Sequence, residues 1–263
     1  MLAFVTGASS GIGKEMAREL SRRGYDLIIT GRNKNALESL EKELKTNVKI
    51  IIADLTKEDE VYRLYKQVEN EAIDVFINNA GFGVYGYFWN TNLEKEINML
   101  KVNDLAMHIL FKLILKDMIS SRNKYSLENN EKYILNVASL SGFMPGPQMS
   151  SYYASKSYML NLTQGVYQEL KMLNMDRNIH VSVLCPGPIY TNFCARAGVE
   201  FKIKYLSSKY TARYAINKLF KKKMVIVPGF INKCGHALGK ILPSKFIMKF
   251  ICKIQEPKRV ETL

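Results

Sequence analysis

The amino-acid sequence predicts an α/β fold in a single domain: a doubly wound parallel sheet of about seven strands with helices on both faces. Two observations carry this prediction. Over the first two-thirds of the chain, short apolar runs alternate with amphipathic stretches of helical periodicity. Runs without a polar face are typical of strands in a parallel sheet that helices cover on both sides. The length of 263 residues and the hydrophobic fraction of 47% are enough for one sizeable core.

The elements follow in order along the chain. Runs rich in Val, Ile and Leu predict strands near residues 2–6, 26–30, 48–53, 74–77, 132–137, 180–184 and 224–227. The stretches between them predict helices over 12–23, 34–45, 57–71, part of 93–119, 152–173 and 212–223. The polar stretch 120–131 predicts a surface loop, and Pro228 with Gly229 ends the last strand.

A glycine-rich turn joins the first expected strand to the first expected helix. Its glycines, Gly7, Gly11 and Gly13, have the spacing GxxxGxG. Backbone N–H groups and the positive end of the helix dipole bind anions at such a turn, and glycines let a pyrophosphate approach closely. We therefore expect a Rossmann-type dinucleotide site here. The alternative is a turn selected only for tight packing of strand against helix.

The end of the second expected strand bears on the choice of cofactor. NAD-binding folds usually place an acid there to bond the ribose 2′-OH. This chain has Arg32 instead, and Asp26 lies at the opposite end of the strand. Because a guanidinium suits a 2′-phosphate, we expect NADP (NADPH) rather than NAD. The alternative for Arg32 is a solvated arginine at the start of a helix.

A tyrosine and a lysine form the candidate catalytic pair. Tyr152 and Lys156 are four residues apart and share one face of a helix. An ammonium beside a phenol is expected to lower its pKa from about 10 toward the working range. Ser139 lies thirteen residues before Tyr152, after the fifth expected strand, where parallel sheets bind ligands. Taken alone, a Tyr and a Lys at this spacing usually indicate a solvated helix face.

These motifs together resemble the short-chain dehydrogenase/reductase family over about residues 2–230. The resemblance rests on the TGxxxGxG turn, the NNAG stretch at 78–81, Ser139, the YxxxK pair and the Pro-Gly pair at 186–187, in that order. It implies a catalytic set of Ser139, Tyr152, Lys156 and Asn103. In the family, the matching Asn lies at a local helix break and holds a water in a proton relay; without the resemblance, Asn103 would be interpreted as a surface residue.

The resemblance also implies the cofactor contacts. They come from the glycine turn, from the ends of later strands and from the catalytic helix: Gly7, Ser9, Ser10, Gly11, Ile12, Gly13, Arg32, Asp54, Leu55, Asn79, Ala80, Gly81, Tyr152, Lys156, Pro186, Gly187, Ile189 and Thr191. Asp54 would contact the adenine ring, although it is also a candidate helix N-cap. Thr191 would contact the nicotinamide carboxamide.

The implied reaction is reversible hydride transfer between nicotinamide and a carbonyl or alcohol carbon. Phe143, Met149, Tyr190 and Phe193 are candidates for an apolar substrate wall, or for plain loop packing. They favour an apolar ketone, a 3-oxoacyl chain or a steroid-like alcohol as substrate. Two alternatives are a membrane-associated reductase of lipid intermediates and an NADP-binding regulatory or scaffold protein without turnover. The intact Ser139, Tyr152 and Lys156 argue against the second.

The positive charge is concentrated in the last quarter of the chain. Residues 196–263 hold 16 Lys and Arg against three Asp and Glu, whereas residues 1–195 hold 22 against 21. Lys245, Lys249 and Lys253 form a stripe on an otherwise apolar stretch, which predicts a helix packed on the core or on another subunit, or one lying on anionic lipid. We expect a cofactor-binding catalytic domain at 1–230 and a basic extension at 231–263. No nucleic-acid motif accompanies the charge, so no nucleic-acid partner is expected.

The remaining features set broader limits. The four cysteines show no CxxC spacing and the three histidines are scattered, so we expect free thiols and no metal. No apolar run is long enough to span a membrane, and the start lacks the pattern of a signal peptide. These features predict a cytoplasmic location, with peripheral membrane contact through the basic helix as the alternative. The resemblance implies a homo-dimer or homo-tetramer.

Overall fold

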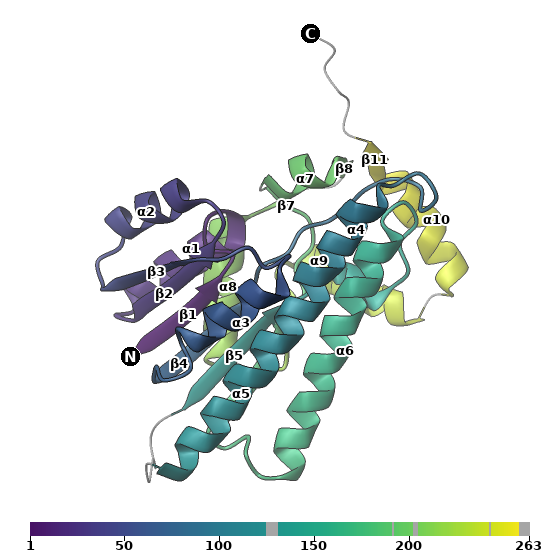
Figure 1. Ribbon diagram of the computed structural model, residues 1–263. Helices are drawn as coiled ribbons and strands as arrows, with labels where there is room; N and C mark the ends of the chain where they lie inside the picture. The colour runs from purple at the N-terminus through teal and green to yellow at the C-terminus, as the bar shows by residue number, and fades with distance from the viewer. Residues whose placement is uncertain (125–130, 191, 202–204, 242, 258–263) are drawn as a thin grey trace.

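The fold is built on one parallel sheet (Figure 1). The computed structural model describes residues 1–263 except 125–130, 191, 202–204, 242 and 258–263. Seven strands pair in the order β10-β6-β5-β4-β1-β2-β3. They are β1 Leu2–Thr6, β2 Asp26–Gly31, β3 Val48–Ile52, β4 Ile73–Asn78, β5 Lys132–Val137, β6 Ile179–Leu184 and β10 Val225–Ile226. The predicted doubly wound α/β fold is therefore confirmed.

The strand order determines where a ligand can bind. β1 pairs with β2 on one side, from Leu2 opposite Asp26 to Thr6 opposite Thr30, and with β4 on the other side. The chain leaves the carboxyl end of β1 toward β2 on one side and the carboxyl end of β4 toward β5 on the other. The two connections therefore diverge between β1 and β4. Open parallel sheets bind ligands in the crevice outside such a switch point.

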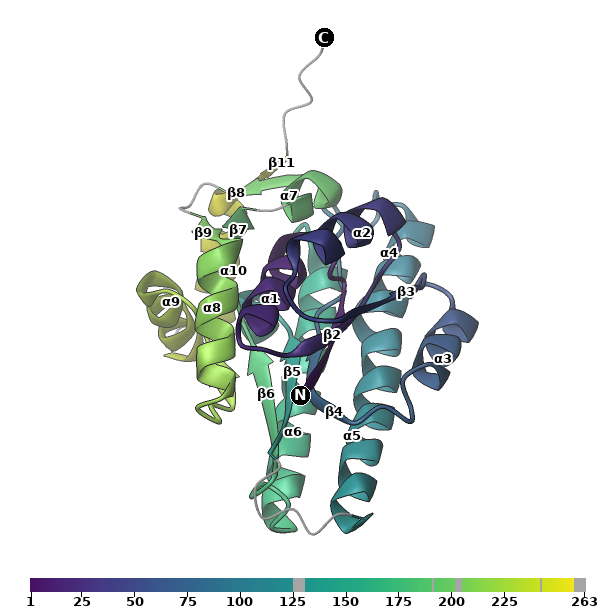
Figure 2. The ribbon, with the colours of Figure 1, turned by 90° about the vertical axis from the view of Figure 1, so that its left-hand side faces the viewer.

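Helices cover both faces of the sheet (Figure 2). One face packs against α1 Gly11–Arg22, α2 Lys34–Glu43 and α8 Ser208–Leu219, and the other against α3 Glu58–Lys66, α5 Met107–Lys124 and α6 Ser150–Met172. Each strand alternates its side chains between the two layers. On β1, Ala3 and Val5 therefore join the core on the first face, whereas Phe4 stacks on Phe76 of β4 on the second, with ring centroids 5.1 Å apart.

The helix expected within 93–119 has an irregular centre. It begins as α4 Leu93–Leu100, continues as a π-helical segment, η1 Lys101–Ala106, and ends as α5. π-helical segments within α-helices are often found at functional sites. α5 extends to Lys124, into the stretch expected to be a loop, and the rest of that stretch to residue 130 lies outside the described residues.

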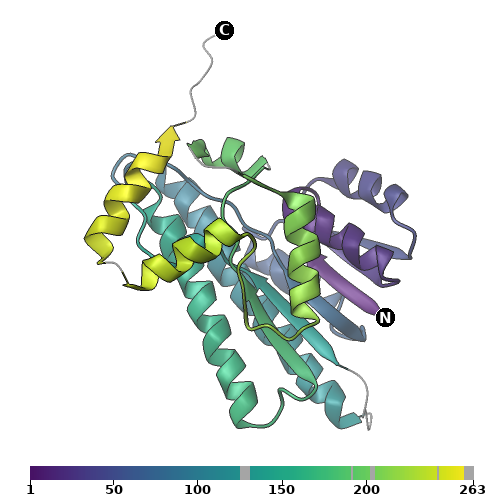
Figure 3. The same cartoon turned by 180° about the vertical axis from the view of Figure 1, so that it is seen from behind.

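The second half of the chain adds small elements around the carboxyl edge of the sheet. They are η2 Leu140–Phe143, β7 Ile189–Tyr190, α7 Asn192–Ala197, β8 Val199–Phe201, β9 Leu206–Ser207, α9 Phe230–Ile241, α10 Ser244–Ile254 and β11 Gln255–Pro257. Only α10 was expected among the last three. Figure 3, seen from behind, shows α9 and α10 on the viewer's side, with α9 crossing in front of α6. β11 pairs antiparallel with β8, which returns the described end of the chain to the α7–β8 segment. None of the helices described is long and apolar enough to cross a membrane.

Candidate active site

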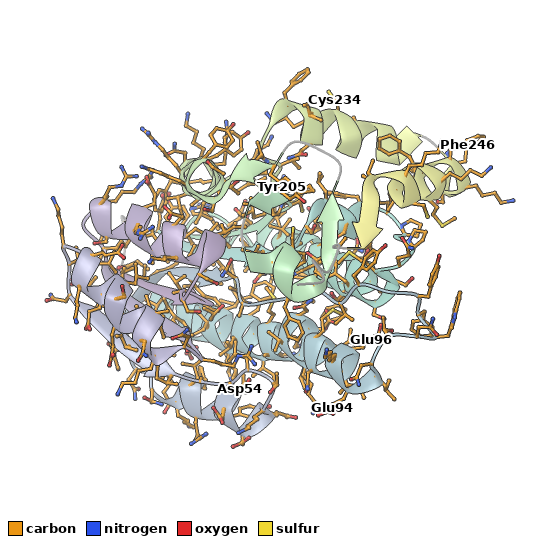
Figure 4. All side chains as sticks on the ribbon, turned by 90° about the horizontal axis from the view of Figure 1, so that it is seen from above. Asp54, Glu94, Glu96, Tyr205, Cys234 and Phe246 are labelled. Atoms are coloured by element: carbon orange, nitrogen blue, oxygen red, sulfur yellow. The ribbon has the colours of Figure 1, made fainter. Side chains whose placement is uncertain are left out.

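A cavity of about 1820 Å³ opens along the carboxyl edge of the sheet. Its lining runs from the glycine turn, past the ends of β4 and β5, to α10 at the far side. Figure 4 looks down on this edge; Asp54, after β3, and Phe246, on α10, lie at opposite ends of the view. Ligand pockets usually measure about 300–1,000 Å³, so this cavity has room for more than a small substrate.

The glycine turn leaves the floor of the cavity open. Gly7 has φ +65°, and a Cβ there would lie 2.9 Å from the Ala80 Cα atom. The Asn79 side chain donates to the Thr6 and Gly7 carbonyls at 2.9 and 3.3 Å, which ties the end of β4 to the turn. Gly13 is buried below, where a Cβ would meet the Asn79 amide at 2.4 Å. Gly13 therefore serves packing rather than direct lining.

The start of α1 has free donors for an anion. Ser10 is its N-cap but makes no side-chain capping hydrogen bond, and Ser9, Ser10, Gly11 and Ile12 all line the cavity. The first N–H groups of a helix have no partner within it, and they carry the positive end of its dipole. The residues present therefore fit a pyrophosphate.

Arg32 lines the cavity after β2, where the 2′-phosphate of a bound dinucleotide could reach its guanidinium. Its guanidinium is 3.9 Å from the Asp54 carboxylate, its side chain is 60% exposed, and both residues line the cavity with Leu55. A Cβ on the neighbouring Gly31 would lie 3.3 Å from the Ser9 hydroxyl, so a hydroxyl donor flanks the same spot. Asp54 accepts from the Thr56 N–H at 3.1 Å, a turn contact rather than a helix cap, since α3 begins at Glu58.

Ser139, Tyr152 and Lys156 meet in the middle of the cavity. β5 ends just before Ser139, whose hydroxyl donates to the Pro186 carbonyl at 3.4 Å and accepts from the Ser141 N–H at 3.2 Å. Tyr152 and Lys156 lie on α6, and the Lys156 ammonium is 5.8 Å from the centre of the Tyr152 ring. That ammonium donates to the Val137 carbonyl at 3.2 Å. Ser139, which lies thirteen residues before Tyr152 in the sequence, is thus a neighbour of the Tyr152 and Lys156 pair on α6.

The pKa values in this cluster are set mainly by burial. Burial raises the pKa of Tyr152 to about 12, although the Ser139 and Ser141 hydroxyls act in the opposite direction. The same loss of water lowers the pKa of Lys156 to about 8, which Asp104 partly offsets. The expected lowering of the Tyr152 pKa is therefore wrong for this structure, because burial of the phenol is the largest influence on that pKa and raises it.

The π-helical segment brings Asn103 beneath the cluster. Asn103 is fully buried; its amide donates to the Phe82 carbonyl at 2.9 Å and to the Ser155 hydroxyl at 3.1 Å, and its oxygen accepts from the Phe82 N–H at 3.0 Å. A Cβ on Gly81 would lie 2.9 Å from the Asn103 oxygen and 3.2 Å from the Lys156 nitrogen. The helix irregularity implied by the resemblance is present, and Asn103 is no surface residue.

Asp104, the next residue, gave no signal in the sequence. Its Oδ1 atom is buried with no hydrogen-bond partner, and burial raises the pKa of its carboxyl to about 6. The Lys156 ammonium opposes that rise. A carboxylate thus faces the lysine from the π-helical segment.

The expected substrate residues divide. Met149 and Phe193 line the cavity, and a Cβ on Gly83 would lie 3.1 and 2.8 Å from their side chains. Phe143 does not; it lines a separate crevice with Met248 and packs against the core at Ala138. Thr191 and the side chain of Tyr190 lie outside the described residues. Pro186, Gly187 and Ile189 line the cavity as expected.

The C-terminal segment packs on the core as one of the sequence alternatives predicted, and it also forms a wall of the cavity, which the sequence did not reveal. Ile247 and Ile251 of α10 are buried against Met99, Met149 and Tyr153. The Gln255 amide donates to the Tyr153 hydroxyl at 2.6 Å, and Asn232 of α9 lies where a Cβ on Gly187 would meet it at 2.5 Å. The described parts of α9, α10 and Gln255 therefore pack directly on the candidate site. No group of His, Cys, Asp and Glu suited to a metal ion occurs in the part of the chain that the structure describes.

Comparison with known proteins agrees with this geometry. The family model described as short chain dehydrogenase matches residues 1–200. Hydroxysteroid dehydrogenase-like protein 1 of Gallus gallus is 29% identical over 96% of this chain and 76% of its own length. A very-long-chain 3-oxoacyl-CoA reductase of Vanderwaltozyma polyspora is 30% identical over 68% of this chain and 54% of its own length.

A solved structure is similar over nearly the whole chain. A short-chain dehydrogenase from Sphingobium yanoikuyae, in complex with NADPH, superposes with a TM-score of 0.78 at 26% identity. The alignment covers 92% of this chain and 96% of that one. The match extends beyond the residues 1–200 that the family model covers.

Proposed function

Because the chain belongs to the short-chain dehydrogenase family of oxidoreductases and such proteins use nicotinamide cofactors, we propose that it is an NADP-dependent reductase of apolar carbonyl compounds. The observation that carries the proposal is the convergence of Ser139, Tyr152 and Lys156 in one cavity beside the glycine turn. Arg32, with Ser9 beside it, supports NADP. The similarity to a protein solved with NADPH points the same way.

In the proposed reaction, the bound nicotinamide supplies or accepts hydride, and the residues of this chain control the proton and the orientation. Ser139 holds the substrate oxygen by a hydrogen bond. Tyr152 donates its proton to that oxygen in the reductive direction, a role that suits a phenol held protonated by burial. Lys156 would hold the nicotinamide ribose, and Asn103 anchors the π-helical segment beneath Tyr152 and Lys156.

The cavity supports an apolar substrate longer or bulkier than a simple ketone. Beyond Tyr152 it is walled by Met149, Phe193, Ile247 and Ile251, which supply no charge. The relatives named as a hydroxysteroid dehydrogenase-like protein and a 3-oxoacyl-CoA reductase favour a steroid-like alcohol or a 3-oxoacyl chain. A membrane-associated reductase of lipid intermediates is the second candidate, which the surface of α10 supports.

The test compares two adjacent tyrosines. Tyr152→Phe is expected to bind NADPH normally but to lose about 10²–10⁴-fold in turnover of 3-oxoacyl thioesters and bulky ketones, the usual contribution of a general acid. Tyr153→Phe removes a hydroxyl that bonds Gln255 instead, and should retain turnover. Equal turnover in the Tyr152→Phe variant and the wild type would assign the protein to cofactor-dependent binding without catalysis.

We also propose a homo-dimer or homo-tetramer. Leu93, Ile97 and Leu100 of α4 and Leu105 of η1 are exposed, and burying such side chains is a common basis of subunit contacts. Sedimentation velocity of the purified protein tests this; a monomer at all concentrations would exclude it.

A further inference from the structure

The mouth of the cavity carries exposed apolar side chains on the side of the C-terminal helices. Phe246 and Phe250 of α10 line the cavity and are nevertheless 65% and 63% exposed. Phe230 and Ile231, at the start of α9, also line it and are 80% and 76% exposed. These side chains face outward at the entrance while Ile247 and Ile251, on the inner face of α10, are buried.

The opposite wall of the mouth has the same character. Gly86 and Asn90 line the cavity, and the residues between them, Tyr87, Phe88 and Trp89, project into solvent with exposures of 52–77%. The rings of Tyr87 and Trp89 stack with centroids 5.1 Å apart. α10 and the segment that leads into α4 lie on the same side of the molecule in Figures 1 and 3. We call the seven side chains the apolar rim: Tyr87, Phe88, Trp89, Phe230, Ile231, Phe246 and Phe250.

Positive charge accompanies the apolar rim. Lys245 and Lys249 are exposed on α10 directly before the rim residues Phe246 and Phe250, Lys253 is exposed one turn further along the helix, and Lys233 is exposed on α9. The sequence from 230 to 255 contains no Asp or Glu. Glu94 and Glu96 of α4 do not line the cavity, whereas Lys95 between them does, and Figure 4 shows both glutamates away from Phe246. Thr91 donates to Glu96 at 2.9 Å. The rim on α9 and α10 is therefore both apolar and uniformly basic.

We infer that the apolar rim docks on an anionic lipid surface, with α10 lying in the headgroup layer and the cavity mouth open toward the bilayer. Aromatic side chains and snorkelling lysines are the pair of features that hold a helix at a membrane interface. An apolar substrate could then enter along the wall of Phe246 and Phe250 without crossing water. This last step rests on the proposed function; the docking itself does not.

The position of the rim favours a membrane over a second protein. Because Phe230, Phe246 and Phe250 line the cavity, a tightly packed partner or second copy on this surface would close the entrance. A lipid surface covers the same side chains while it supplies an apolar substrate. Charge complementarity selects anionic lipid in particular.

Vesicle sedimentation of the full chain tests the docking. The protein should bind vesicles of phosphatidylcholine mixed with phosphatidylserine, bind phosphatidylcholine alone weakly, and be released by salt. Lys245→Glu/Lys249→Glu should weaken binding more than about 25-fold, since each lysine lost near an anionic surface removes a factor of about five and each glutamate adds repulsion. Its control is Lys221→Glu/Lys223→Glu, an equal change of charge just before β10. These lysines lie at the amino ends of the parallel strands, away from the cavity, so this variant should bind vesicles as the wild type does.

The apolar contribution is tested by a matched pair of double variants. Phe246→Ser/Phe250→Ser should abolish vesicle binding, whereas Met172→Ser/Leu173→Ser, with similar exposures at the far end of α6, should not. Failure of wild-type protein to bind anionic vesicles would overturn the inference. An equal loss of vesicle binding in both lysine double variants would also overturn it. A third contradicting result would be a wild-type dimer that does not bind vesicles and that Phe246→Ser/Phe250→Ser converts to a monomer.

Activity separates this inference from the proposed function. With a water-soluble ketone, Lys245→Glu/Lys249→Glu should match the wild type in turnover, and with a substrate dissolved in anionic vesicles it should be slower. Equal rates on the vesicle substrate would contradict delivery through the rim. Absence of turnover on every substrate would instead reject the proposed function and leave the vesicle result to decide the docking.

Discussion

Replacing Arg32 with glutamate should change which nicotinamide cofactor the protein prefers. Its guanidinium is 60% exposed and 3.9 Å from Asp54, so a bound 2′-phosphate would meet a solvated rather than a buried cation. A hydrogen bond to a charged group is worth about 1.5–3 kcal/mol, and the exposure places this one near the lower end. A glutamate at this position would also repel the 2′-phosphate by about 1 kcal/mol in a solvated setting. The sum of about 2.5 kcal/mol predicts an NADPH affinity about 60-fold weaker.

NADH should respond differently, because it has no 2′-phosphate and a glutamate can accept a hydrogen bond from the ribose 2′-OH. Titration of cofactor fluorescence with both dinucleotides measures the two affinities. Lys42→Glu, at the other end of α2, gives the same change in charge on an exposed site and should leave both unchanged. If Arg32→Glu lowered the NADH and NADPH affinities equally, or lowered neither affinity, Arg32 would have no part in recognising the 2′-phosphate.

Three further predictions follow from the cluster around Lys156. Burial gives the Asp104 carboxyl a pKa of about 6, so from about pH 4 to 6 the folded chain keeps a proton that the unfolded chain has lost, and the stability of the fold falls as pH rises. Urea unfolding should therefore find Asp104→Asn about 1–2 kcal/mol more stable than the wild type at pH 7 but not at pH 4. An equal gain in stability at both pH values would show that burial of the carboxylate is not the cause. The pKa of Lys156 is about 8, so turnover should fall as pH rises through that value. In Asp104→Asn the fall should begin at a lower pH, because Asp104 helps to keep the lysine charged. An unchanged pH profile in that variant would show that Asp104 does not influence the titration of Lys156. Gly81→Ala should lose turnover while it folds, because its Cβ would press on Asn103 and Lys156, whereas Gly165→Ala, with open space around it, should unfold at a temperature no lower than the wild type.

The sequence predicted those parts of the molecule that local patterns determine. Five of the six longer strands are runs with both faces buried, and β3, at the edge of the sheet, is only partly buried. The positions of these strands followed from their apolar composition, and the parallel sheet followed from the alternation with helices. The glycine turn was visible because its spacing and its place after β1 are local. Ser139, Tyr152 and Lys156 were found through a spacing that the resemblance made meaningful.

What the sequence did not reveal depends on contacts between distant residues. Gln255 meets Tyr153 across 102 positions, and no local pattern announces that the tail would wall the cavity. Phe143 looked like a substrate residue because it lies between Ser139 and Tyr152, yet η2 turns it toward the core. The direction of the Tyr152 pKa shift was missed because burial is a property of the folded molecule. The π-helical register at Asp104 has no signature in the sequence.

The most direct test of the central claim follows the hydride itself. Purified protein would be incubated with NADPH deuterated at the transferring position of the nicotinamide and with a panel of 3-oxoacyl thioesters and bulky ketones. The account predicts deuterium on the carbinol carbon of a product, seen by mass spectrometry, and a rate of deuterium incorporation about 10²–10⁴-fold lower with Tyr152→Phe. Tight NADPH binding with no deuterium in any product would contradict it and would leave a cofactor-binding protein in place of a reductase.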